Sequence, residues 1–178
     1  TSIDASNGPV QISANVVIEP FTKIVGPCFI GANTTIQPNS IIKGSYIGHH
    51  CKVGGEVNNS IIQHYSNKSH YGYIGDSVIG EWNNLGAGTT ISNLKLSYGK
   101  VKSPVPLSQE NHLTDRQFLG AIFGDHVRTG IQSSFSCGTI ISSACSLYGT
   151  RTHAKFIPPF TWGKADGYHH QDLDAFLN

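Results

Sequence analysis

The sequence predicts an all-β fold, a parallel β-helix, from two regular spacings. The first is an aliphatic residue that returns every six positions, at Ile12, Ile18, Ile24, Ile30, Ile36 and Ile42. The six-residue phase continues, with short interruptions, at Ile47, Val53, Ile62, Lys68, Ile74, Ile79, Leu85, Ile91, Phe123, Thr129, Phe135, Ile141 and Leu147. A repeat this short is typical of coils whose strands cannot bury an apolar side chain alone and therefore stack on the next coil.

The second spacing places small or β-branched residues four positions after the aliphatic ones. They are Val16, Thr22, Cys28, Thr34, Ser40, Cys51, Val57, Ser66, Thr89, Val127, Ser133, Thr139 and Cys145. An even offset in an extended strand points to the same face, so both residues are expected in the interior. We therefore expect Cys28, Cys51 and Cys145 to fill the core. Gly, Asn and Pro between the repeats are typical of tight corners.

Three repeats closing a triangle predict coils of about 18 residues, and about six coils in all. The β-helix domain is expected over residues 1–157. Residues 94–121 lose the period and contain Pro104 and Pro106, which predicts a long inserted loop. Residues 158–178 are expected to form a tail that could include one short helix. The sequence holds no Met and is patterned almost from Thr1, so we expect a fragment of a longer chain.

Composition argues against several classes of function. The net charge is +1, from 12 Lys and Arg against 11 Asp and Glu, which disfavours a nucleic-acid binder. There is no run of the ~18 apolar residues that a membrane span needs. Neither a secretory signal nor a paired cysteine framework is visible among the four cysteines, so a cytoplasmic location is expected.

The most informative stretch is residues 64–102. It contains, in order, His70, Tyr73, Ile74-Gly75-Asp76, Gly86-Ala87-Gly88-Thr89, Asn93 and Lys100. This ordered set resembles the hexapeptide-repeat acyltransferases. It is most similar to the acetyltransferase half of the bifunctional N-acetylglucosamine-1-phosphate uridyltransferase and glucosamine-1-phosphate acetyltransferase, and to related sugar-1-phosphate nucleotidyltransferases. The resemblance covers roughly residues 30–150 and implies a left-handed β-helix, although the general crossover rule favours right-handed connections.

The resemblance also implies an activity, N-acetylation of an amino-sugar phosphate with acetyl-CoA as co-substrate. It makes His70 the general base, a role that suits an imidazole near neutral pH. It places Tyr73, Asn93, Lys100 and Glu56 around the acceptor, and Ile131 and Gly149 against coenzyme A. It further implies a homotrimer with sites between subunits, and an N-terminal nucleotidyltransferase domain that this chain lacks.

Two departures leave other functions open. Gln37 and Asn58 stand where the family has basic residues for the acceptor phosphate, and losing two cations weakens phosphate recognition. The alternatives are a non-catalytic trimerisation domain of a sugar nucleotidyltransferase, or a sugar O-acetyltransferase. No metal site is expected, because His64 and His70 are one repeat apart and so lie on adjacent sides of the triangle.

Overall fold

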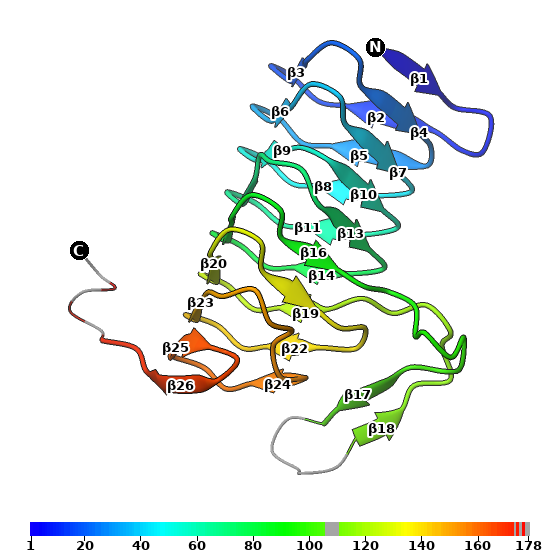
Figure 1. The fold of residues 1–178 in the computed structure, drawn as a ribbon. Helices are drawn as coiled ribbons and strands as arrows, with labels where there is room; N and C mark the ends of the chain where they lie inside the picture. The colour runs from blue at the N-terminus through cyan, green and yellow to red at the C-terminus, as the bar shows by residue number, and fades with distance from the viewer. Residues whose placement is uncertain (106–110, 173, 175, 177–178) are drawn as a thin grey trace.

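The computed structural model describes residues 1–105, 111–172, 174 and 176, and it shows the parallel β-helix that the repeats predict (Figure 1). Successive short strands visit three sheets in turn, so each coil has three sides. Each strand bonds to the strand one coil above and the strand one coil below. The aliphatic residues therefore stack in register, as in Ile24, Ile42 and Val57 on one side.

Sheet A has seven parallel strands: β1 (Ser2–Asp4), β4 (Lys23–Val25), β7 (Ile41–Lys43), β10 (Glu56–Asn58), β13 (Tyr73–Gly75), β16 (Thr90–Ile91) and β21 (Ser134–Phe135). Sheet B has eight: β2 (Val10–Ile12), β5 (Cys28–Ile30), β8 (Tyr46–Ile47), β11 (Ile61–Ile62), β14 (Val78–Ile79), β19 (Ile122–Phe123), β22 (Ile140–Ile141) and β24 (Phe156–Ile157).

Sheet C has nine strands: β3 (Val17–Ile18), β6 (Thr35–Ile36), β9 (Lys52–Val53), β12 (Asn67–Lys68), β15 (Asn84–Leu85), β20 (Arg128–Thr129), β23 (Ser146–Leu147), β25 (Thr161–Lys164) and β26 (Gly167–His170). The last of these, β26, pairs antiparallel with β25 and closes the end of the stack. We refer below to the C–A corner, where the chain turns from sheet C into sheet A, and to the A–B corner, where it turns from sheet A into sheet B.

The expectation of about six coils was too low, since sheets A and B are seven and eight strands deep. The six-residue phase omits strands at both ends whose inward residues fall outside the six-residue spacing, such as Ile3, which pairs with Ile24, and Ile157, which pairs with Ile141. The N-terminal β1 and the C-terminal β25 belong to these extra turns. Part of the expected tail, residues 158–178, is thus sheet strand. The expected short helix falls in a stretch that includes residues 173, 175 and 177–178, which lie outside the described residues.

The core is a set of inward columns. The largest side chains with almost no exposed surface are Phe123, Phe135, Ile24, Ile30, Ile36, Ile42, Ile47, Ile62, Ile74, Ile79, Ile91 and Ile141. The small residues four positions on are also buried, except for the partly buried Val16, and their hydroxyls satisfy backbone carbonyls: Thr34 Oγ1 donates to Gly48 O at 2.8 Å. Cys28, Cys51 and Cys145 are free and buried, which confirms them as core residues.

The corners are tight enough to need left-handed backbone. Asn33 and Asn39 adopt φ of 57° and 58°, a region that Asn tolerates better than most residues. The sequence signal of Asn and Gly between repeats therefore has a direct backbone cause.

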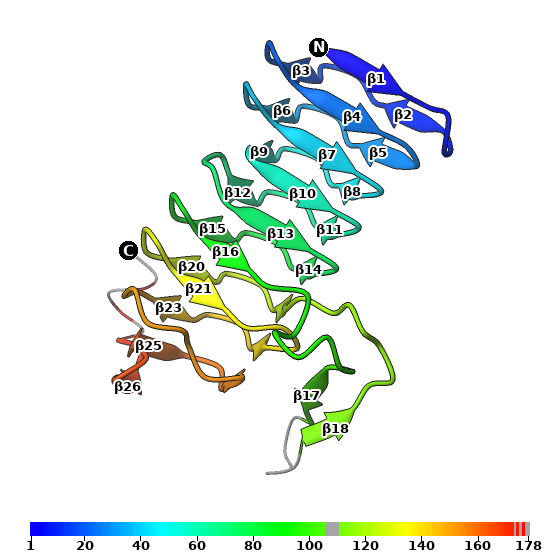
Figure 2. The ribbon, with the colours of Figure 1, turned by 45° about the vertical axis from the view of Figure 1, so that its right-hand side comes forward.

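The chain leaves the coil after Asn93, and the described part of residues 94–121 contains two antiparallel strands, β17 (Lys102–Pro104) and β18 (Asn111–Leu113), seen projecting beside the stack in Figures 1 and 2. The two strands are anchored at their base. Val101 is fully buried, and Lys155 Nζ donates to Lys102 O at 2.8 Å and to Cys137 O at 2.9 Å.

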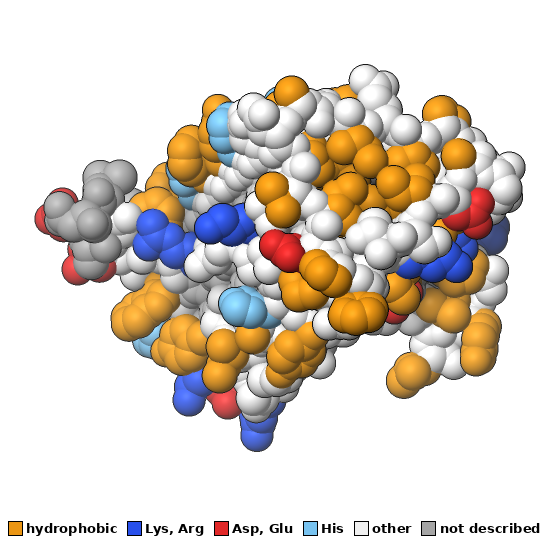
Figure 3. All heavy atoms as spheres, turned by 90° about the horizontal axis from the view of Figure 1, so that it is seen from above, with side chains coloured by type: hydrophobic (Ala, Val, Ile, Leu, Met, Phe, Trp, Pro, Cys, Tyr) orange, Lys and Arg blue, Asp and Glu red, His pale blue; other side chains and the backbone are white. Residues whose placement is uncertain are grey.

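Charged side chains are scattered over the face drawn in Figure 3, with basic and acidic groups interspersed among apolar ones. Among the described residues, no helix has the length and apolarity required to cross a membrane.

Ile42 offers a test of the stacked core. Ile42→Ala is expected to lower the free energy of unfolding by about 2–5 kcal/mol, because it removes packed methyl groups and leaves a cavity. Ile41, the preceding residue in β7, is 44% exposed, so Ile41→Ala should cost much less. Urea denaturation of both variants measures the difference, and equal losses would contradict the assigned register.

Candidate functional site

The outward face of sheet A brings several of the sequence-predicted residues together. Glu56 on β10 and Tyr73 on β13 are direct neighbours in the ladder. They line an open pocket of about 360 Å³ at the C–A edge of the sheet. The pocket is lined by Asn39, Ile41, Gly55, Glu56, Tyr71, Gly72 and Tyr73.

His70 lies at the C–A corner, exposed to solvent, between β12 and β13. Its neighbour Gly72 forms part of the pocket wall and has φ of 130°. A Cβ on Gly72 would come within 2.1 Å of Thr89 O, so this corner can close against the coil below only with glycine. The sequence thereby places His70 in the corner that forms one wall of the pocket, although His70 itself is not among the residues that line it.

The residues predicted to contact coenzyme A lie in the same corner column as His70. The ladder pairs Asn67 with Asn84, Asn84 with Arg128, and Arg128 with Ser146. Three residues after each of these positions the chain reaches the C–A corner. The corner residues on successive coils are therefore His70, Ala87, Ile131 and Gly149. Ile131 is 71% exposed, so the column below His70 presents one apolar side chain between two small residues.

The side chain of Tyr73 extends along its own strand, β13, toward Gly75. Its phenol lies over Gly75, where a Cβ would come within 2.2 Å of the Tyr73 hydroxyl oxygen. The pKa of Tyr73 is raised, mainly by burial and further by the charges of Asp76 and Glu56, while side-chain hydrogen bonds with Asn58 and Asn93 oppose the rise. The phenol therefore stays protonated near neutral pH and can donate a hydrogen bond.

Asp76 connects the inserted loop to the sheet. Its Oδ1 accepts from Asn59 Nδ2 at 2.6 Å, and its Oδ2 accepts from Asn93 Nδ2 at 2.5 Å. Its backbone carbonyl accepts from the N–H of Gly120 at 2.8 Å. Asp76 thus holds both the residue where the loop leaves the coil and the residue where it returns.

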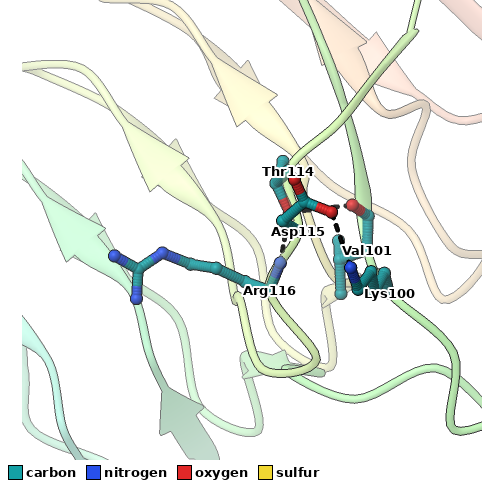
Figure 4. Close-up of polar contacts among 5 residues, drawn as sticks. All are labelled: Lys100, Val101, Thr114, Asp115 and Arg116. Atoms are coloured by element: carbon teal, nitrogen blue, oxygen red, sulfur yellow. Dashed lines mark hydrogen bonds and ion pairs between the residues drawn. The ribbon is translucent and has the colours of Figure 1, made fainter.

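Lys100 is not drawn into this cluster. Its Nζ pairs with Asp115 Oδ1 at 2.7 Å within the loop, and both side chains are exposed (Figure 4). The ammonium group lowers the pKa of Asp115 through their hydrogen bond. Figure 4 also shows the Arg116 side chain extending away from this pair.

The two positions where the family has basic residues carry no charge and do not line the pocket. Asn58 ends β10 beside Gly75, and Gln37 packs against Gly54 on the next coil. Neither side chain can offer the ionic contact that a phosphate prefers.

Sequence reasoning missed Lys68. Although it occupies an aliphatic position in the six-residue phase, its side chain is 2% exposed and lies in the core beneath His70. Its Nζ donates to Gly54 O at 2.8 Å and to His70 O at 2.6 Å. Burial lowers the pKa of Lys68 to about 8. The available signal was a charged residue in a column of aliphatic ones.

The described residues contain no group of three or more His, Cys, Asp or Glu side chains placed to hold a metal ion. His64 stacks on His49, at 4.8 Å between ring centroids, and its Nδ1 accepts the backbone N–H of His49. His64 thus has a role within the stack, on a different corner from His70.

Comparison with known proteins agrees with the repeat and the fold. Residues 9–44 match the family model described as bacterial transferase hexapeptide (six repeats). The chain is 38% identical over 153 residues to the bifunctional sugar-1-phosphate nucleotidylyltransferase/acetyltransferase of Sulfurisphaera tokodaii, covering 78% of this chain and 36% of that protein. The chain is similar to hexapeptide-repeat transferases.

A second relative, the bifunctional protein GlmU of Methanococcus aeolicus, is 38% identical over 109 residues, covering 61% of this chain and 25% of that protein. The chain thus spans roughly a quarter to a third of the length of these relatives.

Two solved structures share the fold. The polysialic acid O-acetyltransferase OatWY aligns with a TM-score of 0.55 at 15% identity, covering 96% of this chain and 88% of that one. The UDP-N-acetylglucosamine acyltransferase of Campylobacter jejuni aligns with a TM-score of 0.51 at 15% identity, covering 95% and 71%. At this identity the likeness concerns the fold alone.

Asp76 gives a test of the loop anchor. Asp76→Ala removes the acceptor of both Asn59 and Asn93, so amide hydrogen exchange should speed up at residues 93–95 and 118–120. Asp115→Ala, which breaks an exposed ion pair on the loop itself, is the matched control and should leave these amides unchanged. Unchanged exchange in Asp76→Ala would show that the carboxylate does not anchor the loop.

Proposed function

We propose that this chain is an acetyltransferase domain that moves an acetyl group from acetyl-CoA to the amine of an amino-sugar phosphate. The observation that carries the proposal is the position of the exposed His70 in the corner whose next two residues, Tyr71 and Gly72, line a pocket together with Glu56 and Tyr73. The similarity to a bifunctional nucleotidylyltransferase/acetyltransferase, which extends over 78% of this chain, supports the choice of reaction.

In this proposal His70 is the general base. The amine nitrogen attacks the thioester carbonyl carbon, a C–N bond forms and the C–S bond breaks. The amine proton passes to the imidazole and then to the departing thiolate, which leaves as a thiol. An exposed His beside a pocket suits this exchange because a neutral imidazole accepts a proton and releases it again near neutral pH.

The acceptor would lie on the face of sheet A. Tyr73 offers a protonated phenol and Glu56 a carboxylate, which are partners for sugar hydroxyls and for an ammonium group. Asn93, held in place by Asp76, would add an amide from the start of the loop. Coenzyme A would follow the corner column below His70, past Ile131 and Gly149.

The phosphate would need a cation, since Gln37 and Asn58 supply none. Lys100 is the loop residue that we propose for this contact, and to make it Lys100 would exchange Asp115 for the phosphate. The exposed Lys100–Asp115 pair is weakly held, so this exchange costs little.

We also propose that the domain assembles as a homotrimer through sheet B. The outward column of sheet B is almost wholly apolar over seven successive strands: Phe29, Tyr46, Ile61, Val78, Ile122, Ile140 and Phe156. The outward column of sheet C is polar over Lys52, Asn67, Asn84 and Arg128. A flat apolar side of this length is typical of an interface between subunits.

His70→Ala tests the proposed base. It should lower kcat for acetyl transfer by roughly 10²- to 10⁴-fold, the usual contribution of a general base. A thiol-release assay with acetyl-CoA and a panel of amino-sugar 1-phosphates measures it. His169→Ala, an exposed histidine on β26, is the control and should keep full activity.

Three results would redirect the proposal. Turnover that survives in His70→Ala would remove His70 as the base. Turnover on sugars that carry only hydroxyl acceptors would indicate an O-acetyltransferase. No turnover on any sugar by an intact oligomer would favour a trimerisation domain without catalysis.

Ile122→Asp tests the assembly surface. A charge in the middle of the apolar column should shift the molecular mass measured by light scattering from trimer to monomer. Asn84→Asp, the same charge on the outward face of sheet C, should leave the mass unchanged. A trimer that persists in Ile122→Asp would place the interface elsewhere.

A further inference from the structure

A buried lysine lies directly under the corner that carries His70. Of the residues in the six-residue aliphatic phase, Lys68 alone carries a charge, and its neighbour in the ladder on the coil above is Val53. Taking an ammonium group out of water costs several kcal/mol in a protein interior. A sequence selected for stability alone would place an aliphatic residue here, as it does elsewhere in the column.

The ammonium group of Lys68 is directed at two backbone carbonyls. One belongs to Gly54 on the coil above, at 2.8 Å, and the other belongs to His70, at 2.6 Å. Gly54 therefore bonds to Lys68 twice: its carbonyl accepts from the side chain, and its N–H donates to the backbone carbonyl of Lys68 at 2.7 Å. The two corners, Gly54–Gly55 and His70–Gly72, are thus joined through one side chain.

The fit around this group is close. A Cβ on Gly55 would come within 3.1 Å of Lys68 Nζ and 2.7 Å of Gly72 O. Gly55 and Gly72 both line the pocket beside Glu56 and Tyr73. The ammonium group therefore lies behind the pocket wall rather than in the pocket, and it cannot contact a ligand without moving that wall.

We propose that Lys68 is a positioning residue that holds the His70 corner by drawing the carbonyl of His70 toward the core. This inference rests on the proposed function, in which His70 is the base. Fixing the carbonyl fixes the peptide plane that follows His70, and with it the direction in which the imidazole leaves the backbone. Nothing else in the corner gives a charged hydrogen bond to that carbonyl among the described contacts.

Other charges around Lys68 do not compete for it. Burial is the cause of its lowered pKa. The ionisable side chains on the strands and corner packed around it are Lys52 on β9, Glu56 on β10, Tyr73 on β13, and His70 and Tyr71 in the corner. All are exposed except Tyr73, which is half-buried.

Lys68→Met tests the inference, since Met keeps the length of the side chain and removes the ammonium group. We expect kcat to fall roughly 10- to 100-fold, the loss that follows from displacing a catalytic group, while KM for acetyl-CoA changes less than about twofold. Lys52→Met, an equal charge change one coil away on the outer surface, should behave as the wild type. Lys68→Gln, a shorter neutral donor, should restore part of kcat. Equal kcat in Lys68→Met and the wild type would overturn the proposal.

Two further readouts do not depend on turnover. Amide exchange at residues 69–72 should be faster in Lys68→Met than in the wild type, and unchanged exchange there would overturn the positioning role. The pKa of Lys68 is about 8 folded against an ordinary 10.5, so between these pH values the unfolded chain binds a proton that the folded chain has released. The wild type should therefore gain stability relative to Lys68→Met as the pH rises from 8 to 10.5, and no gain would contradict the buried ammonium group.

These readouts separate the two proposals. If the wild type shows no acetyl transfer on any acceptor, the proposed function fails, and the exchange measurement still decides whether Lys68 orders the corner. If His70→Ala loses activity and Lys68→Met does not, the function stands and the inference about Lys68 falls.

Discussion

Register between coils is the constraint on which this structure depends. Each strand is only two to four residues long and finds its hydrogen-bond partners on the coils above and below. Each side chain therefore packs in a column with the side chains at the same position on the coils above and below. Inward columns of Ile and small residues make the core, and outward columns give each of the three sides its own chemistry.

The three sides differ because their outward columns differ. Sheet B presents Tyr46, Ile61, Val78 and Ile122 in succession. Sheet C presents polar groups such as Asn67 and Asn84, and sheet A combines Glu56 and Tyr73 with a pocket at its edge. The interruption of the coil after Asn93 adds a loop at the A–B corner, opposite the edge where His70 lies. In the proposed function, the acceptor would lie on sheet A between the His70 corner and this anchored loop.

The site uses polar groups that a β-helix does not need for folding. Both carboxylate oxygens of Asp76 accept hydrogen bonds from side-chain amides of neighbouring coils. Lys68 is buried at a position that suits an aliphatic residue. Departures from the repeat of this kind concentrate around His70 and Tyr73. That concentration is a physical reason, separate from any resemblance, to look for function on sheet A.

Periodicity in the sequence was enough to predict the parallel β-helix, the inward columns with Cys28, Cys51 and Cys145, and the excursion of residues 94–121, because a local six-residue pattern directly encodes which side chains point inward. It undercounted the coils, because terminal strands such as β1 and β25 form by pairing with a neighbour and need no aliphatic residue in phase.

Tertiary structure alone decided four contacts of the candidate site. They are the pairing of Glu56 with Tyr73, the hydrogen bond from Asn93 to Asp76, the ion pair of Lys100 with Asp115, and the hydrogen bond from Lys68 to the carbonyl of His70. Each depends on how many residues separate one coil from the next. In sheet B that number is 15 between Tyr46 and Ile61, 18 between Ile122 and Ile140, and 44 across the inserted loop between Val78 and Ile122.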